Sequence, residues 1–203
     1  MSENKVLWGI HACRRTSQAG VAAVEFALLV GVFFLLVFAA LETARVIYVF
    51  NTLQEVTRRA ASELVNMRPA DPNSSGIVAV RRRAIFRETG DGMPFAEPIT
   101  IEHVRVEYLS LVRSASGSMT RVPTSPLPTC PVAHRQICMA DPNDSRCVRF
   151  VRVRICQPGD ANNCTPVPYT TYFSLLHLSI NLPRSATIAT AESLGYIPGK
   201  PCS

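Results

Sequence analysis

The side chains in this sequence that are best able to do chemistry are its cysteines. Six of the seven lie in the C-terminal part of the chain, at Cys130, Cys138, Cys147, Cys156, Cys164 and Cys202. An even set of cysteines in one region fits disulfides formed in an oxidising compartment. A tetrahedral zinc site is disfavoured because no two of these cysteines are closer than eight positions, whereas zinc knuckles use the short C-x₂₋₄-C spacing. Among the many possible pairings we predict only Cys156–Cys164, which would close the turn Q-P-G-D-A-N-N after a strand-like run.

No other set of residues has the spacing of a catalytic, cofactor or metal site. The chain contains no G-x-S-x-G, P-loop or G-x-G-x-x-G motif, and its four histidines share no ligand spacing. The basic run Arg81–Arg83 has no interleaved aromatic residues, so we expect a solvated helix face despite the net charge of +6. We therefore expect no enzymatic activity, cofactor, metal, nucleic-acid partner or small-molecule substrate.

A long apolar run near the N-terminus predicts a membrane segment. Phe26–Leu41 holds sixteen residues without a charge, and extending it back to Val21 gives 21 residues with one acid, Glu25. A helix of that length crosses a bilayer, and because it is apolar on every side, lipid or other helices must surround it. The basic residues before it, which place the N-terminus in the cytoplasm, are Lys5, Arg14 and Arg15.

The apolar run continues into an amphipathic segment. After Gly31 no helix breaker appears until Pro69. Apolar residues recur at spacings of three and four, at Leu53, Val56, Ala60, Leu64 and Met67. We therefore predict one helix from about Val21 to about Asn66, with its first half in lipid and its second half in water.

The remainder of the chain predicts a small α+β domain. Hydrophobic residues are 47% and charged residues 18% of the chain, which excludes a disordered protein. Strands are expected at 148–156, 99–108 and 184–192, and His103 is expected in the second of these. A helix is expected from the serines at 74–75 to Gly90, with Ile77, Val80 and Ala84 inward, and the Pro/Gly/Ser-rich segments 68–73, 90–98 and 120–131 are expected to be loops. The expected divisions are a basic leader (1–20), a transmembrane and stalk helix (21–68) and an extracytoplasmic domain held by disulfides (69–203).

The residues at the start of the apolar run resemble a processing site. Gly20 is followed at the fifth position by Glu25 and at the sixth by Phe26, where the apolar helix begins. This resembles the site of type IV prepilin-like proteins, which implies cleavage between Gly20 and Val21 by a membrane-embedded prepilin peptidase. Cleavage would leave the apolar segment on the mature protein, and the Glu25 carboxylate could then meet the Val21 α-amine of a neighbouring helix. Glu25 and Phe26 are thus candidate assembly residues, although Glu25 could also only mark the interface and reach water.

A wider pattern resembles a known family. The stretch A-V-E-F-A-L is followed by the apolar run, then by Glu42, by Arg45 three residues on, and by an Ala-rich amphipathic continuation. This resembles the TadE-like family, membrane proteins of bacterial tight-adherence (Flp) pilus systems. The matching positions are Ala23 to Leu28, Glu42, Arg45, Tyr48, Leu53, Ala60 and Ala61. Gly31 stands where many members have proline, so a proline-specific bend is not expected.

The resemblance implies a role and a location. The role is that of a minor pilin-like protein, or pseudopilin, in biogenesis of a Flp (type IVb-like) pilus. The location is the bacterial inner membrane in a single pass, with the N-terminus cytoplasmic and the C-terminal domain periplasmic. The implied partners are a prepilin peptidase and other pilus assembly or pseudopilin subunits.

A conventional secretory signal is the alternative. Phe26 to Val37 is an adequate hydrophobic region, and V-F-A before Ala40 is an adequate signal-peptidase site. This alternative predicts a secreted or membrane-anchored, disulfide-rich binding module. The mature N-terminus separates the two interpretations, because it is Val21 in the first and Ala40 in the second.

Overall fold

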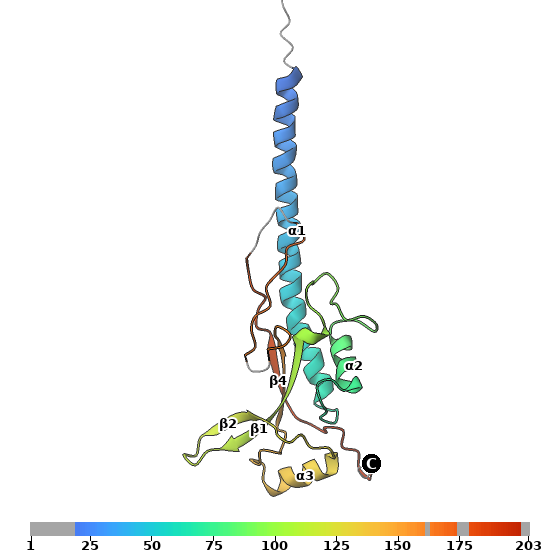
Figure 1. The fold of residues 1–203 in the computed structure, drawn as a ribbon, viewed down its shortest axis with the longest axis vertical. Coiled ribbons are helices and arrows are strands. Elements are labelled where there is room, and N and C mark those ends of the chain that lie inside the picture. The colour runs from blue at the N-terminus through green and yellow to red at the C-terminus, as the bar shows by residue number, and fades with distance from the viewer. Residues whose placement is uncertain (1–18, 161–162, 174–178, 200–203) are drawn as a thin grey trace, which may run out of the picture. The chain divides into compact units, whose positions relative to one another are not determined.

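The structure is a computed structural model that describes residues 19–160, 163–173 and 179–199 of the 203-residue chain (Figure 1). By its internal contacts the chain divides into two compact units, Met1–Ala40 and Leu41–Ser203. We call them the N-terminal unit and the head unit. Cys13 and Cys202 lie outside the described residues.

One long helix, α1, runs from Ala19 to Leu64, close to the bounds predicted from the sequence. It is uninterrupted because the segment contains no proline, and Gly31 alone does not break it. In the N-terminal unit its apolar side chains are exposed, and an 18-residue window reaches a mean hydropathy of 2.7 with no residue buried. By length and composition this helix can cross a membrane.

The second part of α1 belongs to the head unit and supplies a large share of its core. The face predicted from the spacing is buried, with Leu53, Val56, Ala60 and Leu64 essentially inaccessible to solvent. Met67, just beyond the helix, packs against the same core. The amphipathic pattern of this part of α1 therefore arises because its apolar face is buried in the core of the head unit.

Four antiparallel strands form one sheet in the order β2-β1-β3-β4. Their bounds are Val104–Arg113 for β1, Met119–Pro123 for β2, Phe150–Ile155 for β3 and Ala186–Thr190 for β4. Val106 is paired with Val153, and Tyr108 with Val151. These side chains are buried in the same cluster as the apolar face of α1. The opposite face carries charged side chains, as the period of two requires.

Two short helices also belong to the head unit. Helix α2, Ser75–Ala84, buries Ile77, Val80 and Ala84 as predicted. It ends before Gly90, because Ile85 leaves the helical conformation and Phe86 takes a φ of 63°. Helix α3, Pro131–Ala140, begins with proline in its first turn, where the missing N–H is not needed. The fold class is α+β, as expected.

Two local predictions were wrong, and one helix was not predicted at all. His103 is not in a strand, because Ile101–His103 forms a 3₁₀ turn in which the His103 ring and the Thr100 backbone and side chain bond to one another, so that β1 begins at Val104. The expected loop 120–131 contains most of β2, which completes a hairpin with β1. The third difference is helix α3, a segment in which no element was expected.

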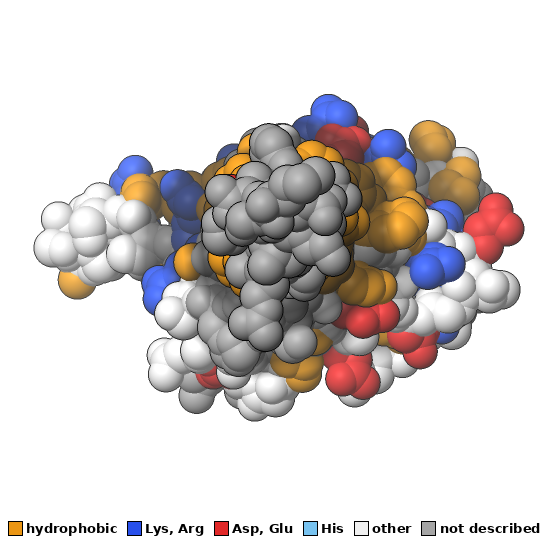
Figure 2. All heavy atoms as spheres, turned by 90° about the horizontal axis from the view of Figure 1, so that it is seen from above, with side chains coloured by type: hydrophobic (Ala, Val, Ile, Leu, Met, Phe, Trp, Pro, Cys, Tyr) orange, Lys and Arg blue, Asp and Glu red, His pale blue; other side chains and the backbone are white. Residues whose placement is uncertain are grey.

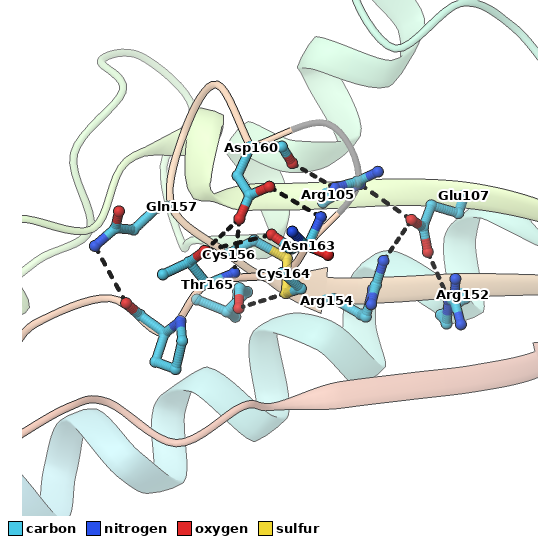
Figure 3. Close-up of a disulfide and its surroundings, with 12 residues drawn as sticks. Arg105, Glu107, Arg152, Arg154, Cys156, Gln157, Asp160, Asn163, Cys164 and Thr165 are labelled. Carbon is cyan, nitrogen blue, oxygen red and sulfur yellow. Dashed lines mark hydrogen bonds and ion pairs between the residues drawn. A yellow bond between two sulfur atoms is a disulfide. The ribbon is translucent and has the colours of Figure 1, made fainter.

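Disulfides hold the loops of the head unit. The predicted Cys156–Cys164 bridge is present and closes the turn after β3 (Figure 3). A second bridge, Cys138–Cys147, joins the end of α3 to the segment that enters β3. Cys130 is disulfide-bonded as well. These five cysteines are thus used in disulfides, as the even set in one region predicted.

Candidate functional site

The predicted processing and assembly residues lie on the first turns of α1. Val21 and Phe26 are about 70% exposed, and Glu25 is exposed as well. Val21 and Glu25 are four positions apart and therefore lie on the same side of the helix. A side chain added at Gly20 would meet no atom within 4 Å, so the structure leaves this position free to accept substitutions. These residues form an open helix surface, which is what contact with another helix requires.

A second cluster forms where α1 enters the head unit. Glu42 is only 2% exposed, although it carries a carboxylate. Its Oε1 accepts hydrogen bonds from the hydroxyl of Tyr169 at 2.5 Å and from Nη1 of Arg45 at 3.2 Å. The backbone N–H of Tyr172 donates to the same carboxylate at 3.3 Å. A buried carboxylate is stable only when it is paired and hydrogen-bonded in this way.

Arg45 extends the cluster to two loops. Its Nε donates to the carbonyl of Phe95 at 2.9 Å, and its Nη1 donates to the carbonyl of Thr170 at 2.7 Å. The guanidinium carbon lies 5.1 Å from the ring centre of Tyr169 and 4.7 Å from that of Tyr172, within cation–π range. One arginine therefore fastens the loops around residues 95 and 170 to α1.

Tyr169 is held as a hydrogen-bond donor. Burial, together with its hydrogen bond to Glu42, raises the pKa of the Tyr169 phenol to about 12. The phenol therefore stays protonated at neutral pH and donates to the carboxylate. This arrangement is chemically inert, since the acid, the arginine and the phenol satisfy one another. The cluster thus positions backbone and does not bear the signs of a reactive centre.

One group among the described residues has side chains close enough to suggest a metal site. The ligand atoms of His134, Cys138 and Cys147 lie within 4.8 Å of one another. Both cysteines are joined to each other in a disulfide, so neither offers a thiolate. Nε2 of His134 already accepts the N–H of Val148 at 2.9 Å. These residues do not fit a metal site in the disulfide-bonded protein.

The arginines of the sheet are balanced by an acid. The Glu107 carboxylate on β1 accepts hydrogen bonds from Nε of Arg152 at 2.5 Å and from Nη2 of Arg154 at 2.6 Å (Figure 3). Nε of Arg105 lies 3.0 Å from the same carboxylate. Burial acts to raise the pKa of Glu107, but the hydrogen bonds from Arg152 and Arg154 outweigh it, so the pKa is lowered. This face of the sheet is therefore an ion-pair network.

The predicted solvated face on α2 is also largely paired. Arg82 bonds to Asp91, and Arg83 bonds to Glu63 on α1. Arg81 is half-buried, and loss of hydration lowers the pKa of its guanidinium. Arg82 and Arg83 therefore fasten α2 to its neighbours within the head unit.

Residues 20–62 match the family model of the TadE-like protein. This confirms the predicted resemblance for the segment that holds the exposed start of α1 and the Glu42–Arg45 pair. A TadE-like segment suggests involvement in assembly of a tight-adherence (Tad) pilus, and TadE-like pilus proteins are in general not enzymes. Searches of the curated proteins and of the solved structures gave no match.

The TadE-like match ends within α1, before the sheet begins. The sequence identified Glu42 and Arg45 as positions of the family pattern, but it did not reveal their partners. Tyr169 and Tyr172 lie in a segment without regular spacing, more than 120 residues along the chain. The one signal that could have pointed to them is the need of a buried Glu42 for donors, and burial of Glu42 was itself not predicted.

Proposed function

We propose that this protein is a minor pilin-like (pseudopilin) membrane protein that acts in biogenesis of a tight-adherence (Flp, type IVb-like) pilus. The observation that carries the proposal is the TadE-like match on a helix whose first part is long, apolar and exposed. Exposed apolar side chains along a helix need lipid or other helices around them. The proposed role of the protein is therefore assembly in a membrane, without catalysis.

The proposed location is the bacterial inner membrane, with the N-terminus in the cytoplasm and the head unit in the periplasm. The basic residues before the apolar run favour this orientation. The disulfides Cys138–Cys147 and Cys156–Cys164 support it, because such bonds persist in an oxidising compartment and are rare in the cytosol. The proposed partners are a prepilin peptidase and other pilus assembly or pseudopilin subunits.

Processing and assembly are proposed to use the start of α1. Cleavage between Gly20 and Val21 would create an α-amine with an ordinary pKa of about 8, which is largely protonated at neutral pH. In a membrane, the Glu25 carboxylate of one helix would be stabilised by the new amine of its neighbour. Because Val21 and Glu25 share one side of α1, the same face would carry both groups. Such a pair would set the register of one subunit against the next.

One observation favours the second candidate, a secreted disulfide-rich binding module. The head unit begins at Leu41, directly after the alternative signal-peptidase site that precedes Ala40. Cleavage there would leave the second part of α1, with its buried face, inside the head unit. The module would then be released from the apolar run with its core complete.

The mature N-terminus, determined by mass spectrometry on protein from cells with an active prepilin peptidase, tests both candidates. Val21 supports the pseudopilin, Ala40 supports the secreted module, and Met1 supports a simple membrane-anchored protein. Two matched variants sharpen the result: Gly20→Leu should abolish processing, whereas Ala39→Leu should leave it unchanged. The reverse pattern would overturn the proposed function. Misfolding is not expected at position 20, because no neighbouring atom lies within 4 Å of an added Cβ.

A further inference from the structure

Large apolar side chains remain exposed where the head unit begins, on α1 residues 41–48 and on the loops bonded to them. The set, which we call the aromatic patch, consists of Leu41, Ile47, Tyr48, Phe95 and Tyr172. Phe95 is 74% exposed, and an open groove of about 300 Å³ lies between it and the helix residues Ala44 and Tyr48. Figure 2 shows hydrophobic side chains (orange) at the surface of the molecule beside basic (blue) and acidic (red) ones.

The patch is held open by the structure. The carbonyl of Phe95 accepts Nε of Arg45, so the backbone of this loop is fixed against α1 while the ring points away from the core. Phe95 has a φ of 55°, a left-handed conformation that a bulky residue adopts only when its surroundings impose it. Tyr172 is held by the same cluster. Its backbone N–H donates a hydrogen bond to the Glu42 carboxylate, and its ring lies against the guanidinium of Arg45. Two aromatic rings are thus presented outward at a fixed place.

The position of the patch along the chain identifies its occupant. Leu41 is the last residue of the apolar run, and Tyr48 follows seven residues later, about 10 Å further along an α-helix. The headgroup region on each side of a bilayer is about 5–8 Å thick. If the apolar run spans the membrane, residues 41–45 therefore lie at the depth of the headgroups. The ring of Tyr48 reaches back toward them, because side chains on an α-helix lean toward its N-terminus. Phe95 is at that level as well, because it is bonded to Arg45.

We propose that the aromatic patch lies in the lipid headgroup region of the membrane that α1 crosses, so that the head unit rests on the bilayer through Tyr48, Phe95 and Tyr172. This inference rests on the proposed membrane anchor. Tyrosine suits the position because its ring is apolar and its hydroxyl stays hydrated, and such residues are enriched at membrane interfaces. The patch is continuous along the chain with the apolar run, which favours lipid over a second copy of the protein as its occupant.

The test places single tryptophans in the full chain, in a Trp8→Phe background, reconstituted in vesicles of phosphatidylcholine and phosphatidylglycerol. The probes in the patch are Phe95→Trp and, as a second variant, Tyr172→Trp. The matched control is Met139→Trp on α3, because Met139 is 73% exposed, nearly the same as Phe95, and lies outside the patch. The reference for the anchor is Phe33→Trp, inside the apolar run.

Quenching by lipids brominated at shallow acyl-chain positions gives the readout for the patch probes and the control. Lipids brominated near the ends of the acyl chains give it for Phe33→Trp, which lies near the middle of the apolar run. The patch probes should lose emission and shift to shorter wavelength, whereas Met139→Trp should do neither. If Phe33→Trp is quenched but both patch probes behave like Met139→Trp, the inference is overturned and the anchor stands. If Phe33→Trp is not quenched, the proposed anchor itself fails. If the patch probes shift only as the ratio of protein to lipid increases and are not quenched, the occupant is a second copy, which also overturns the inference.

Discussion

At the residue scale, Arg45 connects three parts of the head unit. It pairs with the buried Glu42 on the same helix and donates to the carbonyls of Phe95 and Thr170 in two separate loops. Removing one member of a buried ion pair is strongly destabilising, because the remaining charge stays buried without compensation. Arg45 therefore matters both for the stability of the head unit and for the position of the loops that carry Phe95 and Tyr172.

We expect Arg45→Ala to lower the free energy of unfolding of the head unit by about 3–5 kcal/mol, because it leaves the Glu42 carboxylate buried and unpaired. The measurement is urea unfolding of the detergent-solubilised full chain, followed by near-ultraviolet circular dichroism. Arg58→Ala is the control, since Arg58 pairs with Glu55 at the same helix spacing but is 74% exposed. It should have little effect. Equal losses in the two variants would contradict the view that burial of Glu42 makes its pairing with Arg45 essential to the fold.

Protonation of a buried histidine gives a second expectation. Burial lowers the pKa of His134 below its usual 6.5, and its Nε2 is occupied as an acceptor by the N–H of Val148. The unfolded chain therefore binds protons more readily than the folded protein, so stability falls as the pH drops below 6.5 towards the lowered folded pKa. His103 contributes in the same direction, because burial lowers its pKa as well.

His134→Gln should make this pH dependence shallower while His103 preserves part of it. The measurement is the free energy of unfolding from urea titrations at several pH values between neutrality and the onset of carboxylate titration. Comparing slopes, and not absolute stabilities, separates the titration from any packing change that the substitution causes. Identical slopes in the variant and the parent would show that His134 is not a source of the effect.

At the scale of elements, the second part of α1 is the helix around which the head unit packs. Leu53 is fully buried between the helix and the rest of the core. We expect Leu53→Ala to lower the free energy of unfolding by about 2–5 kcal/mol, the range for a leucine removed from a well-packed core. Ile188→Ala is the comparison, because Ile188 on the edge strand β4 is 42% exposed and should tolerate truncation better. Chemical unfolding of both variants checks the difference.

A small effect of Leu53→Ala would contradict the view that the buried face of α1 is a main part of the core of the head unit.

The elements that could be predicted are those with apolar residues at a regular spacing, because such residues form one buried face. The α1 helix was predictable because it lacks breakers, and its second part has apolar residues at spacings of three and four. Strand β3 was predictable because its inward residues alternate with Arg152 and Arg154. Strand β2 is exposed on both sides, so it has no alternation of apolar and polar residues to detect. In α3 the buried residue is His134, so this helix has no apolar stripe.

The hydrogen-bonded cluster around Glu42 and Arg45 could not be predicted from the sequence, for a different reason. Arg45 donates hydrogen bonds to carbonyls that lie 50 and 125 positions further along the chain. These are backbone carbonyls, which every residue type carries. Residue types alone give no signal for such bonds. The Cys156–Cys164 disulfide was accessible because its two cysteines are close in sequence and bracket a turn.

At the scale of the whole molecule, the two units have opposite relations to solvent. The N-terminal unit exposes apolar side chains along α1, whereas the head unit buries its apolar side chains and is fastened by disulfides. One helix thus belongs at one end to the proposed assembly segment and at the other to a folded core. A change at the start of α1 should therefore affect association between subunits without unfolding the head unit.

Glu25→Ala is the substitution that tests this separation. In lipid an unpaired carboxylate is unfavourable by about 2.5–3.5 kcal/mol at the bilayer centre and by less near the interface, so its removal should not impair insertion. If Glu25 instead meets the Val21 amine of a neighbouring chain, the variant should reach the membrane normally but co-purify with fewer pilus assembly components, and piliation should fall. Glu63→Ala is the matched control, because Glu63 is a partly exposed acid on the same helix that pairs with Arg83 inside the head unit. It should leave co-purification and piliation unchanged. Normal piliation in Glu25→Ala, with normal amounts of protein in the membrane, would remove the assembly role of Glu25 and leave it as a marker of the membrane interface.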